Sequence, residues 1–518
     1  LNLNSVNSSN NPVTFNLDVK GINSLAFGGT SPIILSTNAT YLDGAHVTST
    51  NSSSAKIYLT GDSVDISNIA ENIEIEFQNI DGKKINVGQN QNLVIDATYS
   101  QTSSQSVPEF QFTGTSSASA KSISIKTSDS IPTDADNLAS FDGLSLSNIE
   151  VVSFNLANEI DFQSTENIVG DILTQVNLTG NGNFNLAGSN IVSGLGKNVT
   201  LNAANYSGNL TVKLDNTGNS INTVTAGTGD DTVTIDGISV FNLNSGDGND
   251  QFFLTSNSDG YNTNVTINGG NGVDTLTFAS GLDFSIGSMA LSNIENFEFT
   301  GGPNATKLVS NAVSAKNYHL SENGTGTINL SIFPTQQVIN LSSLTFDNSF
   351  TQGTDKITVD GSNYSLALNI TGSTFDDEII GTHTAADTLN GGDGNDIIRG
   401  SDGNDTLTGG NGADQIYSGM GNDTVNLSEV YASTDTLVYS IDDGASNVDT
   451  VTGFDVRVAN DVINLDVSEL SSPITYGNGS NASAASTGTI TIYEQALDTD
   501  LNYASNASAS IIKLITPG

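Results

Sequence analysis

Hydrophobic and polar residues alternate over short runs along most of the chain. Val, Ile, Leu, Phe, Thr and Tyr gather in runs of about four to seven residues, separated by Asn, Gly, Ser and Asp. Examples are "KIYLT", "NLVIDATY", "NVTLNAA", "NLTVKL", "DTVTID" and "TITIY". Alternation of this kind predicts strands joined by tight turns, hence an all-β fold. Helical spacing is rare, and the two short candidates are 312–318 and 494–503.

The spacing of the strands indicates their arrangement. From residue 177 to 253 the runs recur about every 10 to 20 residues without long connections, which favours parallel β-solenoid or β-helix segments of stacked coils. Asparagine suits the corners, because it tolerates the left-handed conformation and stacked Asn side chains can hydrogen-bond along a solenoid. For residues 1–160, a set of β-sandwich domains is the alternative.

A nine-residue sequence is repeated four times in phase from Gly391 to Asn426. The copies are "GGDGNDIIR", "GSDGNDTLT", "GGNGADQIY" and "SGMGNDTVN". Three columns agree among the copies: Gly394, Gly403, Gly412 and Gly421; Asp396, Asp405, Asp414 and Asp423; and Ile398, Leu407, Ile416 and Val425. Each copy predicts a glycine turn followed by a short strand with one inward aliphatic side chain.

Two such copies complete a coil of about 18 residues, so residue i lies over residue i+18. This stacking brings Asp396 near Asp414, and Asp405 near Asp423, with turn carbonyls beside them. An all-oxygen site of this kind suits Ca²⁺ better than Zn²⁺ or Mg²⁺. The predicted metal-binding residues are Gly391, Asp393, Gly394, Asp396, Gly400, Asp402, Gly403, Asp405, Gly409, Asn411, Gly412, Asp414, Gly421 and Asp423.

Other copies fit the pattern less well. "GSTFDDEII" and "THTAADTLN" offer Asp377 and Asp387 but lack the central glycine. Three earlier copies, "AGTGDDTVT", "SGDGNDQFF" and "GGNGVDTLT", are separated by 19 and 24 residues and break the nine-residue phase. We interpret them as single calcium clips at the edges of longer coils, or alternatively as ordinary acidic turns. Their predicted metal-binding residues are Gly229, Asp231, Gly248, Asp250, Gly272 and Asp274.

The inward column explains why the repeats need metal. One aliphatic residue in nine makes a thin core against a chain entropy of about 1 to 2 kcal/mol per residue. Repulsion between carboxylates destabilises the empty roll further. Several bound calcium ions, each contributing about 2.7 kcal/mol at a hundredfold excess over the dissociation constant, would supply the missing stability. The segment is therefore expected to fold when calcium binds.

This pattern resembles the G-G-x-G-x-D-aliphatic nonapeptide of the RTX family, calcium-binding proteins exported by type I secretion. The resemblance is strong over residues 391–426. It implies a C-terminal calcium-binding β-roll. "DTVTGFDVRVANDVINLDVSEL", beginning at Asp449, resembles the segment that follows RTX repeats, and the apolar end "ASIIKLITPG" fits it. In the family this segment caps the roll and carries an uncleaved export signal; an ordinary edge strand is the alternative.

Turn spacing and glycine density divide the chain into five predicted parts. They are an N-terminal β domain (1–161), a β-solenoid with isolated calcium clips (162–300), a β-rich connecting domain (301–371), the RTX β-roll (372–428), and a C-terminal cap and type I secretion segment (429–518).

Composition restricts the partners. The chain has 518 residues, 14 Lys and Arg against 56 Asp and Glu, and a net charge of −42. It therefore lacks the basic surface needed to bind nucleic acid. It has no cysteine, and no apolar run long enough for a transmembrane helix. The start, "LNLNSVNSSN", has neither an initiator methionine nor the features of a signal peptide, so we expect a fragment or a processed product.

Enzyme motifs are missing from the sequence. Neither H-E-x-x-H nor G-x-S-x-G occurs, and His46, His319 and His383 lie in unrelated turn-like contexts. We expect these histidines at the surface and predict that the protein is not an enzyme.

A recurring phrase favours a structural role. "LSNIENFEFTGG" begins at Leu291, "LSNIEVVSFN" at Leu146 and the weaker "AENIEIEFQN" at Ala70. The Ile-Glu pair is expected to lie on a strand with Ile inward and Glu outward. Together with the calcium clips, these phrases resemble Gram-negative RTX surface-layer (S-layer) proteins.

That resemblance implies a secreted protein that self-assembles on the outer membrane, with calcium both folding and bridging the subunits. It also implies attachment to lipopolysaccharide through an N-terminal part outside this sequence. An RTX adhesin or other extracellular binding protein is the alternative.

Overall fold

The computed structural model shows an almost entirely β protein built from parallel strands. The described residues are 1–5, 12–17, 22–30, 32–38, 42, 45–49, 55–60, 64–66, 69, 73–77, 85–87, 91–95, 110–113, 122–127, 139–141, 144–157, 160–162, 168–186, 191–193, 198–215, 221–236, 241–256, 265–284, 289–300, 306–314, 316–322, 327–440, 449–454, 461–466, 475–477, 491–494 and 512–515. They fall into two compact units. The N-terminal unit comprises 1–258, 264–276 and 291–294, and the C-terminal unit comprises 259–263, 277–290 and 295–518.

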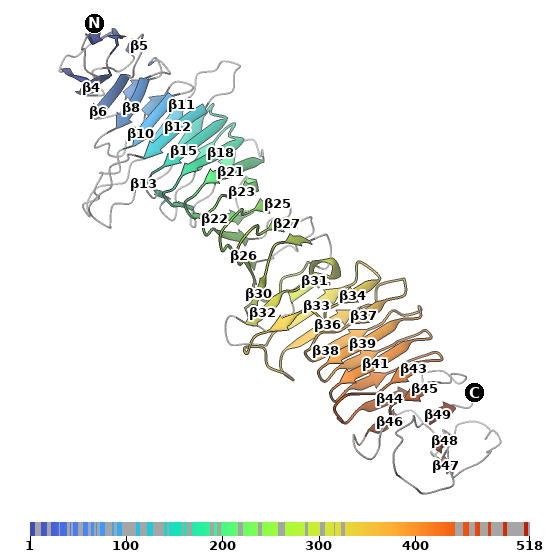
Figure 1. Ribbon diagram of the computed structural model, residues 1–518. Helices are drawn as coiled ribbons and strands as arrows, with labels where there is room; N and C mark the ends of the chain where they lie inside the picture. Colours follow the sequence, from blue (N-terminus) through green and yellow to red (C-terminus); the bar gives the residue numbers. More distant parts are fainter. Residues whose placement is uncertain are drawn as a thin grey trace. The chain divides into compact units, whose positions relative to one another are not determined.

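The N-terminal unit is a parallel β-solenoid whose strands stack like rungs (Figure 1). Its main sheet has the order β2 (Val13–Leu17), β4 (Ile33–Asn38), β6 (Ala55–Thr60), β8 (Ile73–Phe77), β10 (Gln91–Ile95), β12 (Ser122–Thr127), β15 (Val151–Leu156), β18 (Gln175–Gly180), β21 (Val199–Tyr206), β23 (Ile221–Thr225), β25 (Phe241–Asn244) and β27 (Val265–Asn268). A second sheet has the order β13 (Ala139–Phe141), β16 (Ile160–Phe162), β19 (Phe184–Leu186), β22 (Leu210–Asp215), β24 (Thr232–Asp236) and β26 (Gln251–Ser256).

Smaller sheets complete some coils of this unit. They are β1 (Asn2–Ser5), β3 (Ser24–Gly29) and β5 (His46–Ser49); β11 (Phe110–Thr113), β14 (Leu144–Ser147), β17 (Ile168–Gly170) and β20 (Ile191–Ser193); and β7 (Val64–Ile66) with β9 (Ile85–Val87). Strands β28 (Thr275–Phe278) and β29 (Met289–Ser292) have residues in both units. The parallel pairing of β2 to β15 shows that the β-sandwich alternative for residues 1–160 is wrong for the described strands, because a sandwich of that type pairs its strands antiparallel.

The C-terminal unit is also a parallel solenoid. One sheet has the order β31 (Thr306–Val309), β33 (Asn329–Phe333), β36 (Lys356–Asp360), β38 (Asp377–Ile380), β40 (Ile397–Arg399), β42 (Gln415–Tyr417), β44 (Thr436–Ser440) and β46 (Val462–Asp466). The facing sheet has the order β34 (Val338–Asn340), β37 (Asn369–Thr371), β39 (Thr388–Asp393), β41 (Thr406–Asn411), β43 (Thr424–Asn426) and β45 (Thr450–Thr452), followed by β49 (Ile512–Ile515), β48 (Thr491–Glu494) and β47 (Thr475–Gly477). Strands β30 (Asn296–Phe299), β32 (His319–Glu322) and β35 (Thr345–Phe346) pair beside one another.

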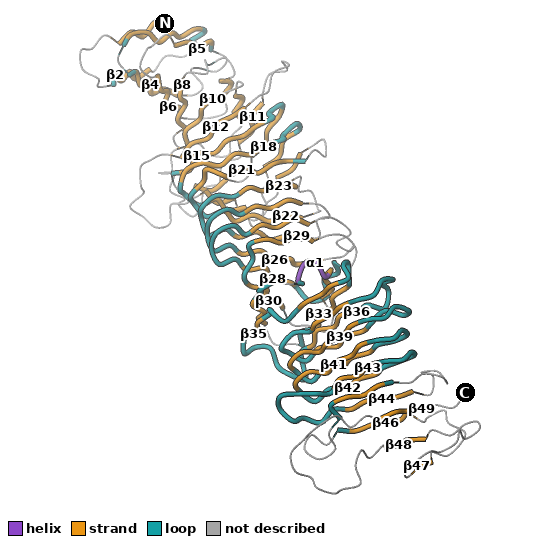
Figure 2. The backbone as a smooth tube through the Cα atoms, turned by 45° about the vertical axis from the view of Figure 1, so that its right-hand side comes forward, coloured by secondary structure: helices purple, strands orange, loops and turns teal. Residues whose placement is uncertain are grey.

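The nonapeptide segment forms the predicted two-strand coils, which we call the roll (residues 387–427). Thr388 pairs with Thr406, and Thr406 with Thr424, so the register advances by one coil at the expected spacing. The inward aliphatics Ile398 and Leu407 are fully buried. The turns between the rungs lie along the edges of the stack, as the tube view shows (Figure 2). The predicted β-solenoid with an RTX β-roll is therefore confirmed, whereas the five-part division of the chain stays a prediction.

The apolar C-terminal end adds a strand of the opposite direction. Strand β49 pairs antiparallel with β45 through Val451 and Ile512, and antiparallel with β48. It interrupts the parallel order of the facing sheet, so the next parallel rung cannot be added at that position.

Helix is nearly absent from the part of the chain that the structure describes. The helix α1 (Ser310–Val313) overlaps only the start of the helix predicted at 312–318, which is therefore wrong beyond Val313. Of the second candidate, Glu494 ends strand β48 and 495–503 lie outside the described residues. The described helix, at four residues, is far shorter than a membrane span requires.

The repeated "LSNIE" phrase forms a corner. Asn148 and Asn293 have φ angles of 56° and 51°, the left-handed conformation that asparagine tolerates. The following Ile149 is fully buried, but it lies between β14 and β15. The expected strand placement is thus wrong for the two "LSNIE" copies, because the left-handed asparagine ends the strand. In the weaker copy, Ile73 and Glu74 do lie in β8.

Candidate metal centre

Buried aspartates directly before or at the start of strands stack into three columns. We define the first column, before the β38–β46 strands, as Asp377, Asp396, Asp414, Asp435 and Asp461; the second, before the β39–β45 strands, as Asp387, Asp405, Asp423 and Asp449; and the third, in the N-terminal unit, as Asp231, Asp250 and Asp274. All are at most 6% exposed. Strand alternation places the inward aliphatic two residues after each aspartate in the nonapeptides, as with Asp396 and Ile398.

One hydrogen bond recurs along each column. The backbone N–H of Asp396 donates to Oδ1 of Asp414 at 2.9 Å, and that of Asp405 donates to Oδ1 of Asp423 at 2.8 Å; both pairs are 18 residues apart. The predicted neighbours therefore lie together. Each column carboxylate other than that of Asp377 thus has Oδ1 held by the adjacent coil, which fixes where its second oxygen lies.

The second carboxylate oxygen is buried without a hydrogen-bond partner at several column positions. Within the described residues this holds for Oδ2 of Asp231, Asp396, Asp405, Asp414 and Asp435. A buried charged oxygen without a partner is costly, so the group must either take up a proton or meet a cation. The described ion pairs join outward side chains, such as Lys356 with Glu378, and do not involve these five aspartates.

The pKa values of the column aspartates show the same cost of burying a carboxylate. Burial, followed by the nearby charge of Asp377, raises the pKa of Asp396 to about 9. Burial raises the pKa of Asp405 and of Asp414 to about 7, although the backbone N–H bond opposes the shift in each case. Burial also raises the pKa of Asp231 to about 8. These carboxyls need positive charge nearby to stay ionised at neutral pH.

Glycines make room for the unpartnered oxygens. A Cβ atom added to Gly391, Gly400 or Gly409 would lie closer than 3.0 Å to Oδ2 of the aspartate five residues later. The central glycine has a different task. Gly412 has a φ of 130°, and a Cβ there would collide with the carbonyl oxygen of Gly394 in the preceding coil. The turns therefore bring carboxylate and backbone carbonyl oxygens together, the ligands that Ca²⁺ prefers.

The two looser copies differ in this respect. Both oxygens of Asp387 are satisfied, Oδ1 by the Leu368 N–H and Oδ2 by the N–H and hydroxyl of Thr382. Asp377 accepts the Ser373 N–H through Oδ2 and keeps a buried Oδ1 without a partner among the described residues. The geometry therefore fits a cation less well at Asp387 than at Asp405.

The three out-of-phase copies are neighbours. The N–H of Asp231 donates to Oδ1 of Asp250, and the N–H of Asp250 to Oδ1 of Asp274. Their spacings equal the lengths of two successive coils, so they continue one column instead of forming isolated clips. Their glycines stack too, because a Cβ on Gly248 would collide with the carbonyl oxygen of Gly229, and one on Gly272 with that of Gly248.

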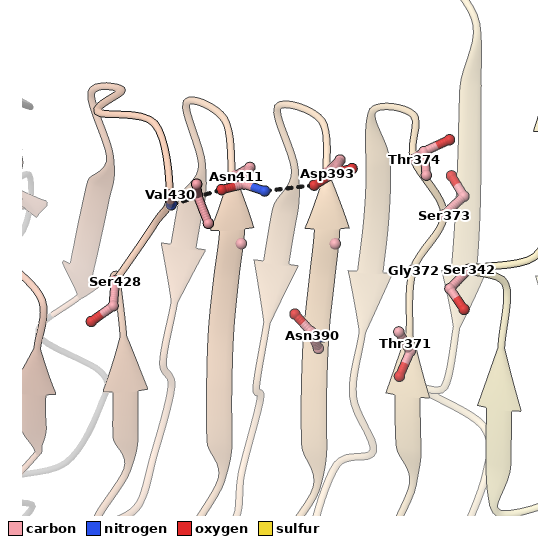
Figure 3. A pocket seen from close by; sticks show the side chains of 12 residues that line it. Ser342, Thr371, Gly372, Ser373, Thr374, Asn390, Asp393, Asn411, Ser428 and Val430 are labelled. Atoms are coloured by element: carbon pink, nitrogen blue, oxygen red, sulfur yellow. Dashed lines mark hydrogen bonds between the residues drawn. The ribbon is translucent and has the colours of Figure 1, made fainter.

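Some predicted ligands lie outside the columns. Asp393 is exposed, and its Oδ1 accepts a hydrogen bond from the side-chain amide of Asn411 at 2.7 Å; Oδ1 of Asn411 accepts the Val430 N–H at 2.9 Å (Figure 3). Their side chains form a ladder along the outer edge of the turns, not with the buried carboxylates. Asp402 is half-buried three residues before Asp405, and its charge adds to burial and to the charge of Asp387 in raising the pKa of Asp405.

Sequence reasoning missed Asp435, Asp449 and Asp461, which extend the first and second columns. Their turns lack the glycine pattern. The available signal was an aspartate directly before an alternating strand, as in "DTLV", "DTVT" and "DVIN".

Comparisons with known proteins agree with the columns. Residues 259–284 and 390–425 match the family described as RTX calcium-binding nonapeptide repeat, in four copies. These two stretches contain Asp274 and the four in-phase copies except for the last residue, Asn426. No curated protein and no solved structure was found to match the chain. The repeats and the β-solenoid fit the RTX-repeat proteins, which are typically secreted and bind calcium.

Proposed function

We propose that the protein is a calcium-dependent structural protein that self-assembles into a two-dimensional surface layer on the outer membrane of a Gram-negative cell. The observation that carries the proposal is the stacking of buried carboxylates, coil after coil, with oxygens such as Oδ2 of Asp396 and Asp414 left without partners among the described residues. Calcium bound there would neutralise the repulsion between stacked carboxylates and hold neighbouring coils together. The result would be a stiff subunit wherever calcium is plentiful.

Surface charge supports an assembly controlled by calcium. The chain carries a net charge of −42, and carboxylates such as Asp247 and Asp393 are exposed on turn edges. Such subunits repel one another until divalent cations bridge their edges. The repeated "LSNIE" phrases, which together with the calcium clips resemble RTX surface-layer proteins, add weight to this proposal.

The route to the surface follows from the same resemblance. We expect type I secretion directed by the C-terminal segment 429–518, and attachment to lipopolysaccharide through a part outside this sequence. A structural role without catalysis accords with the missing hydrolase motifs. The three histidines are exposed and come from different strands and turns.

One observation favours the alternative, an RTX adhesin or other extracellular binding protein. A hollow along the turn edge of the roll and of the neighbouring coils is lined by small polar groups, including Thr371, Ser373, Asn390 and Asp393 (Figure 3). Hydroxyl and amide groups in such a row could bind a polar ligand such as a glycan.

Electron microscopy of the purified chain with calcium and with EGTA tests the proposal. We expect ordered sheets with calcium and dispersed particles with EGTA. Particles that stay single in saturating calcium, yet bind a glycan array, would contradict the surface-layer proposal and support the adhesin.

A further inference from the structure

Three carboxylates converge just after the last nonapeptide. Glu429, Asp435 and Asp461 each place one carboxylate oxygen within 4.8 Å of the other two. Asp435 and Asp461 belong to the first column, and the Asp435 N–H donates to Oδ1 of Asp461 at 3.1 Å. Glu429 lies outside every column and outside the stretches that match the nonapeptide family. The cluster is therefore not one of the repeat sites.

The turn that precedes Asp435 differs from the repeat turns. Asp435 follows Asp414 by 21 residues, whereas Asp414 follows Asp396 by 18. The residue five before Asp435 is Val430, where three of the four repeats have glycine and the fourth has serine. The longer turn brings in the side chain of Glu429, whose Oε1 accepts the Ser433 N–H at 2.6 Å. This bond holds the glutamate in the turn.

Two of these carboxylates have buried oxygens that lack partners. Asp435 is 1% exposed, its Oδ1 accepts the Asp414 N–H, and its Oδ2 has no hydrogen-bond partner among the described residues. Oε2 of Glu429 is likewise buried without a partner in the described part of the chain. Three carboxylates this close together, two of them buried and one half-buried, favour binding of a cation.

The span of the cluster fits one large divalent ion. Calcium binds oxygen ligands at about 2.3 to 2.6 Å, so ligands on opposite sides of one ion lie about 4.8 Å apart. Six or more oxygens are needed, and carboxylates can supply two each. Oxygen-only ligands also exclude the thiolate and imidazole sites typical of zinc.

We propose that Glu429, Asp435 and Asp461 form a calcium site that differs in kind from the nonapeptide sites and closes the first column. In the repeats, glycine in this part of the turn adds no side chain, whereas here the longer turn adds the side-chain carboxylate of Glu429. The inference rests on calcium binding by the columns but not on lattice assembly.

The test compares the full chain with Glu429→Gln by equilibrium dialysis against radioactive Ca²⁺. Glutamine keeps an oxygen to accept the Ser433 N–H while removing the charge. We expect the variant to bind one calcium ion fewer, or to bind one ion about tenfold more weakly, because fewer charged ligands weaken a calcium site. Glu298→Gln is the control: Glu298 accepts the Thr277 hydroxyl at 3.0 Å, away from every column, and this variant should bind like the unmodified chain.

A second variant establishes that the residues share one site. Asp461→Asn keeps an oxygen for the Asp435 N–H, and the double variant with Glu429→Gln should lose no more calcium than either single variant. Circular dichroism in saturating calcium verifies that each variant is folded. An unchanged isotherm for both single variants would overturn the proposed site alone. No calcium bound by the unmodified chain would overturn the calcium-dependent function as well.

Discussion

The roll and the wide coils of the N-terminal unit have the same kind of glycine–aspartate turn, but their cores differ. In the roll each nonapeptide buries one inward aliphatic, such as Leu407 or Ile416. In the wide coil formed by β21 and β22, successive inward residues are fully buried, among them Leu201, Leu210 and Leu214. Burial of each such side chain stabilises by roughly 1.5 to 3 kcal/mol, so the wide coil has far more apolar stabilisation per turn.

The carboxylates are distributed in the opposite way. Each roll coil carries two column aspartates, for example Asp396 and Asp405, whereas each wide coil of the third column carries one. A buried aspartate before a strand therefore destabilises a coil with a thick core only slightly. In a coil with a thin core it dominates the stability. The comparison teaches that the need for calcium depends on the ratio of buried carboxylate to buried hydrocarbon.

Calcium removal should produce the largest difference between the two regions. In EGTA at neutral pH, we expect amides of residues 387–427 to exchange hydrogen almost as fast as in an unfolded chain, while those of strands β21 to β26 stay protected. Each occupied site contributes about 2.7 kcal/mol at a hundredfold calcium excess. Several sites together match the net stability of a domain, about 5 to 15 kcal/mol. Hydrogen exchange followed by mass spectrometry measures both regions in one sample.

Added calcium should restore protection in the roll, and the same concentration of magnesium should not, because Mg²⁺ needs a tighter octahedral site. Equal protection of 387–427 with calcium and with EGTA would show that the thin core suffices, and the comparison would fail.

A single methyl group should produce the next largest effect. Gly412→Ala places a Cβ against the carbonyl oxygen of Gly394 at a φ of 130°. We expect the calcium-loaded roll to lose at least about 2 kcal/mol, since left-handed strain alone costs roughly 1 to 3 kcal/mol. Gly353→Ala is the control, because its φ is 78° but no atom lies within 4 Å of the added Cβ. Urea unfolding in saturating calcium compares the two.

The N-terminal unit offers the matching variant. Gly272→Ala would collide with the carbonyl oxygen of Gly248 in the same way. We expect local loss of protection around the turn while β21 and β22 stay folded on their own core. Global unfolding of that unit would show that its turns, and not its apolar residues, hold it together.

Much of this architecture was predictable because it repeats. The alternation of apolar residues predicted the strands, the spacing of the strands predicted the solenoid, and the fixed spacing from Asp396 to Asp414 predicted which carboxylates meet. The third column was not recognised as continuous, because a solenoid tolerates coils of unequal length, and Asp231, Asp250 and Asp274 remain stacked across spacings of 19 and 24 residues.

Other features could not be predicted from the sequence, because the same sequence pattern occurs in two different structures. The Ile-Glu pair lies on a strand at Ile73 and Glu74 but at a corner after Asn148, where the backbone of Asn148 is left-handed. Likewise, Asp387 and Asp405 occupy equivalent column positions, yet only the structure reveals that Thr382 satisfies Asp387. Partners supplied by local turns cannot be read from spacing alone.

The pH dependence of the calcium-free protein should give the smallest and most specific difference. The pKa of Asp396 is raised from an ordinary 3.8 to about 9, and those of Asp405 and Asp414 to about 7. Between about pH 4 and these values the folded roll binds more protons than the unfolded chain, so its stability falls as pH rises. With calcium the sign reverses, because protons compete with the metal for the same carboxylates.

We therefore expect the calcium-free roll to be partly protected from hydrogen exchange at pH 5, relative to the intrinsic exchange rate at that pH, and to lose this protection at pH 8. In saturating calcium the order of the two pH values should be inverted. The N-terminal unit, where Asp231 has a pKa of about 8, should show the same sign with a shallower slope, since fewer carboxylates share a larger core. Hydrogen exchange along a temperature series separates the two regions. A calcium-free roll that is more stable at pH 8 than at pH 5 would mean that its buried carboxylates are ionised and stabilised without metal, so the thin core would no longer explain a need for calcium.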